Sequence, residues 1–204
     1  SSVTQMEEGA QAVIDRFLTL VKGTEGHWLG ILQGHHYYEF QDGTTSDTRI
    51  ARALQAPFLG TCAYLRLQFR RSKGGAHLAH TLWLHHGVGG GMTLGAPLTQ
   101  LERLVGGFDA NTYLIGHHHK LVTAKKDRVA MSDNASLRSV THTLATTGSW
   151  LRGYMQGNRA PSGKPEGSYV EQRMLLPVTL GGICLRFTPV HVKTTDYLEL
   201  KLEV

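Results

Sequence analysis

The sequence predicts one folded domain of the α/β class, and three observations lead to this prediction. The 204 residues are 41% hydrophobic and 18% charged and contain no block of like charge, as in a typical globular chain. In the first half, apolar segments with a helical period alternate with short apolar runs of strand character. The second half reads mostly as strands. We therefore expect a single domain over residues 1–204.

The first elements follow from hydrophobic spacing and glycine breaks. Residues 6–21 carry apolar side chains at helical intervals, with two glutamates near the start, which predicts an amphipathic helix. Residues 27–32 form a short apolar run bounded by glycines, which predicts a buried strand. Residues 48–54 predict a short helix, and residues 63–69 alternate as a half-exposed strand does.

The next elements repeat a pattern of strand, histidine loop and helix, and the residues after His119 are predicted mostly as strands. Residues 98–105 predict a helix with Pro97 near its first turn. A long surface loop is expected over residues 153–167, which are rich in glycine and proline. The predicted strands are 77–85, 112–115, 121–124, 128–131, 140–147, 183–187 and 197–202.

The cysteine spacing, the length of the apolar runs and the net charge limit the classes of protein to which the chain could belong. Cys62 and Cys184 form no C-x-x-C motif, so we expect two buried, reduced thiols and no zinc ribbon. No apolar run reaches membrane-spanning length and no signal pattern opens the chain, which predicts a soluble, cytoplasmic protein. The net charge of +5 favours phosphorylated or polyanionic partners only weakly.

Twelve histidines are unusual, and their placement indicates a site. Three groups each follow a predicted strand: Gly34-His35-His36, His85-His86-Gly87 and Gly116-His117-His118-His119. Loops at the carboxyl ends of strands converge in open α/β sheets, and imidazole is a common ligand of divalent metals. We therefore expect a metal site. Alternation along an extended segment would direct His117 and His119 to one side and His118 to the other.

Two further motifs allow a functional and a structural interpretation. The glycine-rich residues 87–91 match no nucleotide-binding motif, so a flexible rim of the metal site is favoured. The basic group Arg66, Arg70, Arg71 and Lys73, with Tyr64 and Phe69 interleaved, could follow a nucleic-acid backbone. A solvated strand edge protected by charge is the alternative.

The histidine blocks resemble the last three motifs of the calcineurin-like metallophosphoesterase family. Residues 34–37 are similar to its G-N-H-D/E block, His86-Gly87 to its lone histidine before glycine, and residues 116–119 to G-H-x-H. Residues 147–150, Thr-Gly-Ser-Trp, resemble its closing T-G-S strand. The resemblance implies a two-sheet β-sandwich flanked by helices.

The same resemblance implies roles for individual residues. His35, His86 and His117 would bind one metal, and His119 would face a second. His36 matches the catalytic histidine, which protonates the leaving-group oxygen or stabilises charge on the phosphoryl group. The cofactors would be divalent ions such as Mn, Zn, Fe or Ni, which activate water and clamp the phosphate oxygens.

The sequence departs from the family pattern at two places. The D-x-H and G-D-x-x-D blocks are missing ahead of residue 34, so we expect an N-terminal unit that is truncated, absent or supplied by another subunit. His35 stands where the family has asparagine, and Tyr37 where it has an acid. Tyr37 cannot orient His36 as a carboxylate would.

These observations predict metal-dependent hydrolysis of a phosphomonoester or phosphodiester, with nucleic acid open as a substrate and no membrane partner. One alternative is a degenerate member that binds metal or nucleic acid without turnover. The other is a structural or partner-binding domain. Metal content separates the first two hypotheses from the third, and turnover separates the enzyme from the binder.

Overall fold

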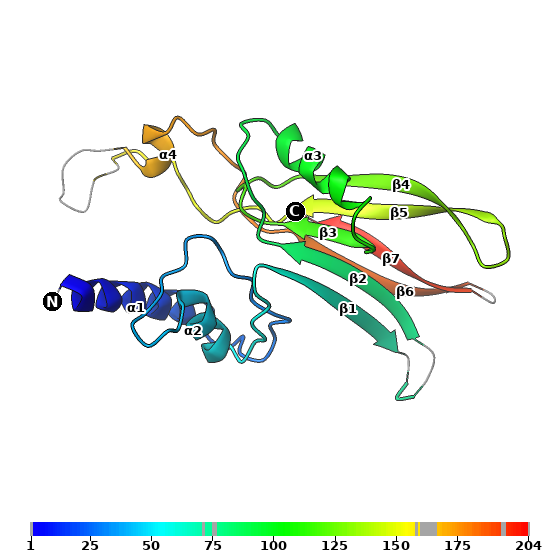
Figure 1. The fold of residues 1–204 in the computed structure, drawn as a ribbon, viewed down its shortest axis with the longest axis horizontal. Helices are drawn as coiled ribbons and strands as arrows, with labels where there is room; N and C mark the ends of the chain where they lie inside the picture. Colours follow the sequence, from blue (N-terminus) through cyan, green and yellow to red (C-terminus); the bar gives the residue numbers. More distant parts are fainter. Residues whose placement is uncertain are drawn as a thin grey trace. The chain divides into compact units, whose positions relative to one another are not determined.

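The computed structural model describes residues 2–70, 72–74, 77–157, 159, 167–192 and 195–203. The chain forms two compact units, Ser1–Ala63 (unit 1) and Tyr64–Val204 (unit 2). The fold class is mixed α/β, as predicted, with helices, a five-stranded mixed sheet and a two-stranded sheet (Figure 1). No helix within the described ranges has the length and apolar character to cross a membrane.

Unit 1 contains both helices predicted for the first part of the chain. α1 spans Ser2–Leu20 and buries Ile14, while α2 spans Ser46–Ala53 and buries Ala51. A capping box starts α2, because the Thr45 hydroxyl accepts from the Thr48 backbone N–H and the Thr48 hydroxyl bonds back to the Thr45 backbone N–H. This box explains why the helix begins before the predicted residue 48.

The strand predicted over residues 27–32 is wrong. This segment makes only an isolated parallel bridge between Ile31 and Phe58. The Ile31 N–H donates to the Pro57 carbonyl, and the Leu59 N–H donates to the Ile31 carbonyl. Gly30 explains the close approach, since a Cβ there would lie 2.3 Å from the Leu59 side chain. The apolar run is therefore part of a packed loop.

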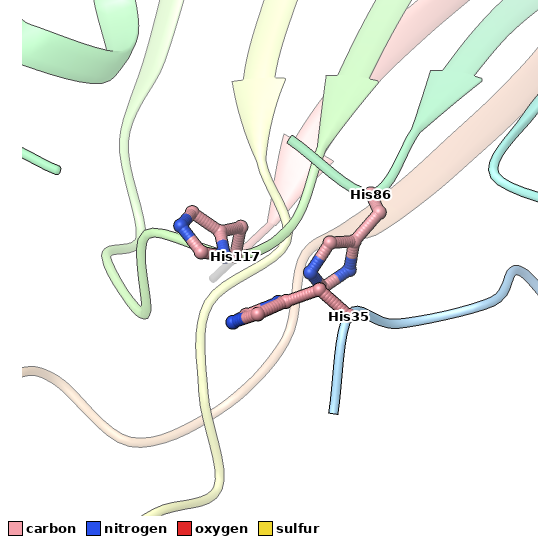
Figure 2. A group of neighbouring side chains, drawn as sticks. All are labelled: His35, His86 and His117. Carbon is pink, nitrogen blue, oxygen red and sulfur yellow. The ribbon is translucent and has the colours of Figure 1, made fainter. Parts of the chain in front are cut away.

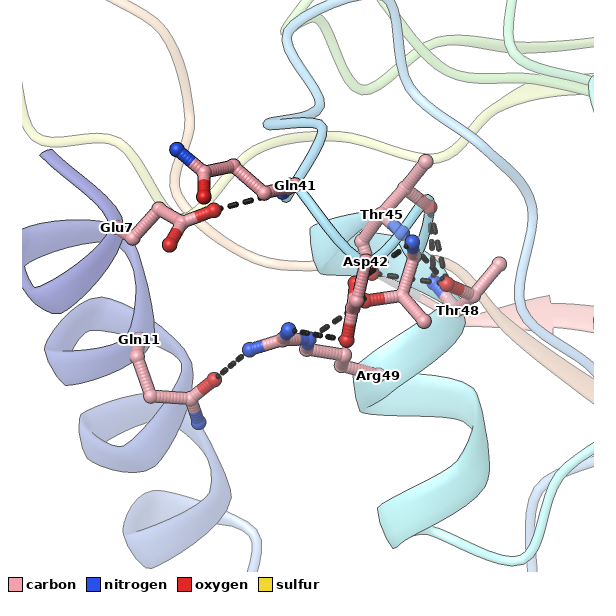
Figure 3. A network of polar contacts seen from close by, with 8 residues as sticks. Glu7, Gln11, Gln41, Asp42, Thr45, Thr48 and Arg49 are labelled. Carbon is pink, nitrogen blue, oxygen red and sulfur yellow. Dashed lines mark hydrogen bonds and ion pairs between the residues drawn. The ribbon is translucent and has the colours of Figure 1, made fainter. Parts of the chain in front are cut away.

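Arg49 connects α2 to α1 and to the loop before α2 (Figure 3). Its guanidinium donates to Gln11 Oε1 at 2.7 Å, to the Thr44 hydroxyl at 2.7 Å and to Asp42 Oδ2 at 2.9 Å. The same group stacks 3.4 Å from the centre of the Phe40 ring. Arginine suits this position because its planar fork serves several acceptors while its face covers an aromatic ring.

We expect Arg49→Ala to lower the free energy of unfolding of unit 1 by about 2 kcal/mol, because it removes charge-assisted hydrogen bonds and a cation–π contact. Arg49→Lys should recover less than half of that loss, since an ammonium cannot reproduce the fork. Urea unfolding followed by circular dichroism measures both values. Arg52→Ala, an exposed change in the same helix, is the control, and an equal effect of both alanine variants would contradict the prediction.

Unit 2 is built on the five-stranded sheet. Its strands are β1 (Cys62–Arg70), β2 (His77–His85), β3 (Thr112–Ile115), β4 (Thr123–Met131) and β5 (Leu137–Thr146). The spatial order is β1-β2-β3-β5-β4, in which β2, β3 and β5 run parallel and β4 pairs antiparallel with β5. The predicted strands 121–124 and 128–131 are one strand, β4, because residues 125–127 pair with β5 as their neighbours do.

One face of the sheet packs against α3, which spans Gly95–Leu104. The core there contains Trp83, Leu101, Val105, Tyr113 and Leu144, all nearly inaccessible to solvent. The Tyr113 hydroxyl donates to the Phe108 carbonyl and accepts from the Ala110 N–H, so burial leaves it satisfied. Each such side chain contributes about 1.5–3 kcal/mol through burial, which fixes the strands that carry the histidine loops.

The opposite face packs against the two-stranded sheet of β6 (Cys184–Val192) and β7 (Thr195–Glu203). Phe187 of β6 lies 5.3 Å from the Phe69 ring of β1 and 4.8 Å from the His80 ring of β2, centre to centre. A short helix, α4 (Tyr169–Gln172), was not predicted. The predicted loop 153–167 lies mostly outside the described residues, which omit 158 and 160–166.

The cysteine prediction is wrong in one respect. Cys62 and Cys184 are free thiols, as expected, but both are exposed instead of buried. Each stands at the first position of a strand with alternating burial, on the exposed side of that alternation. Register, and not the apolar character of the thiol, therefore decides their exposure.

His80 lies half-buried between the two sheets, with Nε2 2.9 Å from the Thr112 hydroxyl. Burial lowers its pKa below the ordinary value of 6.5. Because the unfolded chain then takes up the proton at higher pH than the folded chain, stability is lost as the pH falls through about 6.5. We expect His80→Gln to lose less stability than the native chain between about pH 7 and about pH 5. Urea unfolding at each pH checks this, with exposed His77→Gln as the control, which should keep the native profile.

Candidate metal centre

Three parallel strands of unit 2 end side by side. His85 of β2 is in register with Ile115 of β3, and Ile115 is in register with Thr146 of β5. The loops that begin at His86, Gly116 and Thr147 therefore all start at the carboxyl ends of these strands, on the same side of the sheet. The prediction that histidine loops meet at the carboxyl ends of strands is confirmed for the loops after β2 and β3.

Glycines let these loops approach closely. Gly87 has φ +95°, and a Cβ there would lie 3.0 Å from both the Gly116 carbonyl oxygen and the His117 Cβ. A Cβ on Gly116 would lie 3.1 Å from the His86 carbonyl oxygen. Gly148 has φ +77° and would place a Cβ 2.4 Å from the Gly181 carbonyl oxygen. Side chains at Gly87, Gly116 and Gly148 would therefore crowd the backbone of the neighbouring loops.

His86 and His117 form the centre of the candidate site in unit 2 (Figure 2). Both side chains are partly buried, and their ring centres lie 5.2 Å apart with the planes inclined at 70°. Each offers one ring nitrogen, and these two nitrogens lie within 4.8 Å of each other. Two imidazoles on one tetrahedral zinc would have nitrogens about 3.4 Å apart, which small side-chain rotations would reach.

Gln100 of α3 holds two loops next to this pair. Its Nε2 donates to the Val88 carbonyl at 2.7 Å, and its Oε1 lies 3.0 Å from His118 Nε2. The Lys120 ammonium donates to the carbonyls of Gly91 and Thr93. The glycine-rich loop after His86 is thus fixed by side chains from α3 and from the segment after β3. It forms a rim of the site, and nothing in it resembles a phosphate cradle.

The two histidines next to the pair, His85 and His118, both have a lowered pKa. Burial lowers the pKa of His85, whose Nδ1 accepts from the Gly87 N–H at 2.7 Å. Burial also lowers the pKa of His118, and the positive charges of His117, Lys120 and His119 add to this effect. Neutral neighbours repel a bound cation less than charged ones would. The lowered pKa of His85 and of His118 therefore reduces their repulsion of a cation near His86 and His117.

The prediction that the side chains of residues 117–119 alternate between two sides assumed an extended segment, and this assumption is wrong. His117 has φ +63° and His119 has φ +54°, so the segment is a turn and not an extended strand. The His118 N–H donates to the Gly116 carbonyl at 2.7 Å. His117 is partly buried, whereas His119 is exposed. Positive φ is uncommon for residues other than glycine and concentrates at functional sites.

The histidines of the first block lie in unit 1. His35 and His36 are both exposed, with ring centres 3.8 Å apart. His36 borders an open apolar groove of about 410 Å³, which is lined mainly by α1 and α2. This block lies in a loop, because the strand expected to precede it is absent. His36 therefore stands beside a surface that can accept an apolar group.

Asp47 is a residue whose importance the sequence did not reveal. Its Oδ2 accepts from the Gly34 N–H at 3.2 Å, directly before His35. Burial raises its pKa above the ordinary 3.8, while the hydrogen bond from Gly34 opposes that rise. Asp47 lies partly buried in the first turn of α2. Only the tertiary contact between α2 and residue 34 identifies it.

No family model matches the chain, and no curated protein or solved structure matches it either. The resemblance to calcineurin-like phosphoesterases rests on the motif blocks alone.

Proposed function

We propose that the protein binds a divalent metal ion and hydrolyses phosphate esters with it. The observation that carries the metal proposal is the pairing of His86 and His117 on neighbouring loops at the ends of parallel strands. Loops of this kind form ligand sites in α/β sheets, and two imidazoles with nearby nitrogens suit Zn²⁺ or Mn²⁺. The hydrolytic part of the proposal is supported by the order of the motif blocks.

The remaining roles rest on the sequence pattern. His35 is proposed as the third ligand, His119 as a ligand of a second ion, and His36 as the group that protonates the leaving oxygen. A bound ion would polarise the phosphoryl group and supply hydroxide at neutral pH. Asp47 is proposed to position the turn that carries His35 and His36, since it holds the Gly34 backbone. Within the mixed α/β class, we propose that the fold is the two-sheet sandwich of the phosphoesterase family.

The metal proposal is tested by removing ions from the purified chain with a chelator and titrating Zn²⁺ and Mn²⁺ separately by calorimetry. We expect at least one site to bind with heat release, and loaded protein to melt at higher temperature than stripped protein. Binding should weaken as the solution is acidified, since protons compete with the metal ion for the imidazole nitrogens. A chain with no saturable site for either ion would contradict the proposal.

A binder without turnover is the second candidate function, and one observation favours it. The carboxylates Asp109 and Asp133 are exposed, while Asp42 is engaged by Arg49 and Thr44. Asp47 is the carboxylate held next to the histidine block of unit 1. An enzyme with two ions needs a bridging carboxylate, so metal binding without hydrolysis of a chromogenic phosphodiester would select the binder.

A further inference from the structure

The edge strand β1 of unit 2 presents a row of polar, basic and aromatic side chains. Exposure alternates along this strand, and Tyr64, Arg66, Gln68 and Arg70, here called the β1 row, are all exposed. Alternate side chains of a strand project from one face, about 6.7 Å apart. The four side chains therefore form a line on one face of the sheet. Tyr64 retains 50% of its accessible surface in the folded chain.

The face that carries the β1 row follows from aromatic contacts. Phe69 of β1 and His80 of β2 both contact Phe187 of β6, so these two side chains lie on the face that the two-stranded sheet covers. The β1 row therefore lies on the opposite face. On that face α3 packs against β3, β4 and β5, while His77 and Ala79 at the start of β2 are exposed beside the row.

The charges of the β1 row are not neutralised. Among the described residues, neither Arg66 nor Arg70 forms an ion pair with a carboxylate. Arg70 donates instead to Gln68 Oε1 at 2.9 Å, which orders the two side chains. Lys73 follows in the turn after β1, so the positive charge continues past the end of the strand. Unpaired guanidinium groups in a line are complementary to a chain of phosphates.

The side chains of the β1 row suit single-stranded nucleic acid better than an anionic membrane surface. Single-stranded nucleic acid is bound by basic side chains that follow its backbone and by aromatic rings on which its bases stack. Tyr64 provides such a ring, and Gln68 can donate and accept at a base edge. A membrane surface would require exposed aliphatic side chains among the charges, and the β1 row has none. Phe69, which the sequence placed within the basic group, faces the other way.

We propose that the β1 row binds single-stranded nucleic acid, with Arg66 and Arg70 on phosphates and Tyr64 stacked on a base. The proposal does not depend on the metal centre, because His86 and His117 take no part in it. An unstacked strand can lay its bases on an open sheet face, whereas a duplex keeps its bases paired and offers only its backbone.

The test measures fluorescence anisotropy of a labelled oligouridylate of about 12 nucleotides with the chelator-treated full chain. We expect saturable binding at low salt that weakens as salt rises. Arg66→Ser with Arg70→Ser should lower the slope of log affinity against log salt by about 1.4, because two phosphate contacts are lost. Tyr64→Ser should weaken binding roughly tenfold, and Tyr64→Phe should restore it, because stacking needs the ring and not the hydroxyl.

The control is the double variant Arg128→Ser with Arg138→Ser, which removes two exposed strand arginines from β4 and β5. It should keep the native slope. Equal losses in the two double variants would overturn the proposal in favour of unspecific attraction by net charge. Tighter binding of a duplex of the same length, or of anionic vesicles, would also overturn it. An oligothymidylate of equal length shows whether the bound strand is RNA or DNA.

Discussion

His117→Ala should lower the affinity of the chain for Zn²⁺ and Mn²⁺ by about a hundredfold or more. The change removes one of two imidazoles whose nitrogens lie within 4.8 Å of each other, and a site with few ligands tolerates such a loss poorly. His86→Ala should have an effect of the same size, because the two rings are equivalent donors. Calorimetric titration of chelator-treated protein measures both.

Controls separate loss of a ligand from loss of the fold. His117 has φ +63°, where alanine is strained, so His117→Gly removes the imidazole while accepting the backbone conformation. His77→Ala removes an exposed histidine from the opposite end of β2 and should leave affinity unchanged. His35→Asn should retain or improve binding, since it introduces the asparagine that calcineurin-like phosphoesterases, which the motif blocks resemble, have at this position. Unchanged affinity in both His117 variants would show that these loops are not the metal site.

Strand ends were predictable from the sequence because two signals coincide there. The apolar runs that became β2 and β3 stop at His85 and Ile115, where histidine and glycine replace apolar residues. A strand that is buried on both faces is a nearly continuous run of apolar residues. The change from apolar residues to histidine and glycine therefore shows where such a strand ends. This is why the positions of His86 and His117 could be anticipated, while the pairing of the strands still required the structure.

Other parts of the site depend on contacts that sequence patterns do not encode. In the apolar run 27–32, Ile31 forms an isolated bridge with Phe58. The run does not pair with a neighbouring strand in the described part of the chain, so its local preference for extended structure does not produce a strand. The turn at residues 117–119 follows from left-handed backbone at two histidines, although periodicity favoured an extended segment. Asp47 looked like an ordinary polar residue until α2 brought it to the Gly34 N–H. Each difference comes from tertiary packing that overrides local preference.

The chain should show at most weak phosphodiesterase turnover when loaded with Mn²⁺. Two-metal hydrolysis needs a carboxylate to bridge ions about 3.5–4 Å apart, and no motif of the sequence supplies one. A single ion can still polarise a phosphoryl oxygen, which supports slow hydrolysis of an activated ester. Steady-state release of nitrophenolate from a bis(nitrophenyl) phosphate measures this turnover.

The role of His36 decides how the weak turnover should respond to substitution. If His36 protonates the leaving oxygen, His36→Ala should reduce the rate about a hundredfold for an ester with a poor leaving group and much less for nitrophenolate, which needs no proton. His27→Ala, another exposed histidine of unit 1, should change neither rate. A structural role for His36 would instead lower both rates equally. Rapid turnover by the native chain that His36→Ala abolishes would contradict the expected weak activity, and would show that residues outside the missing motif blocks have rebuilt the site.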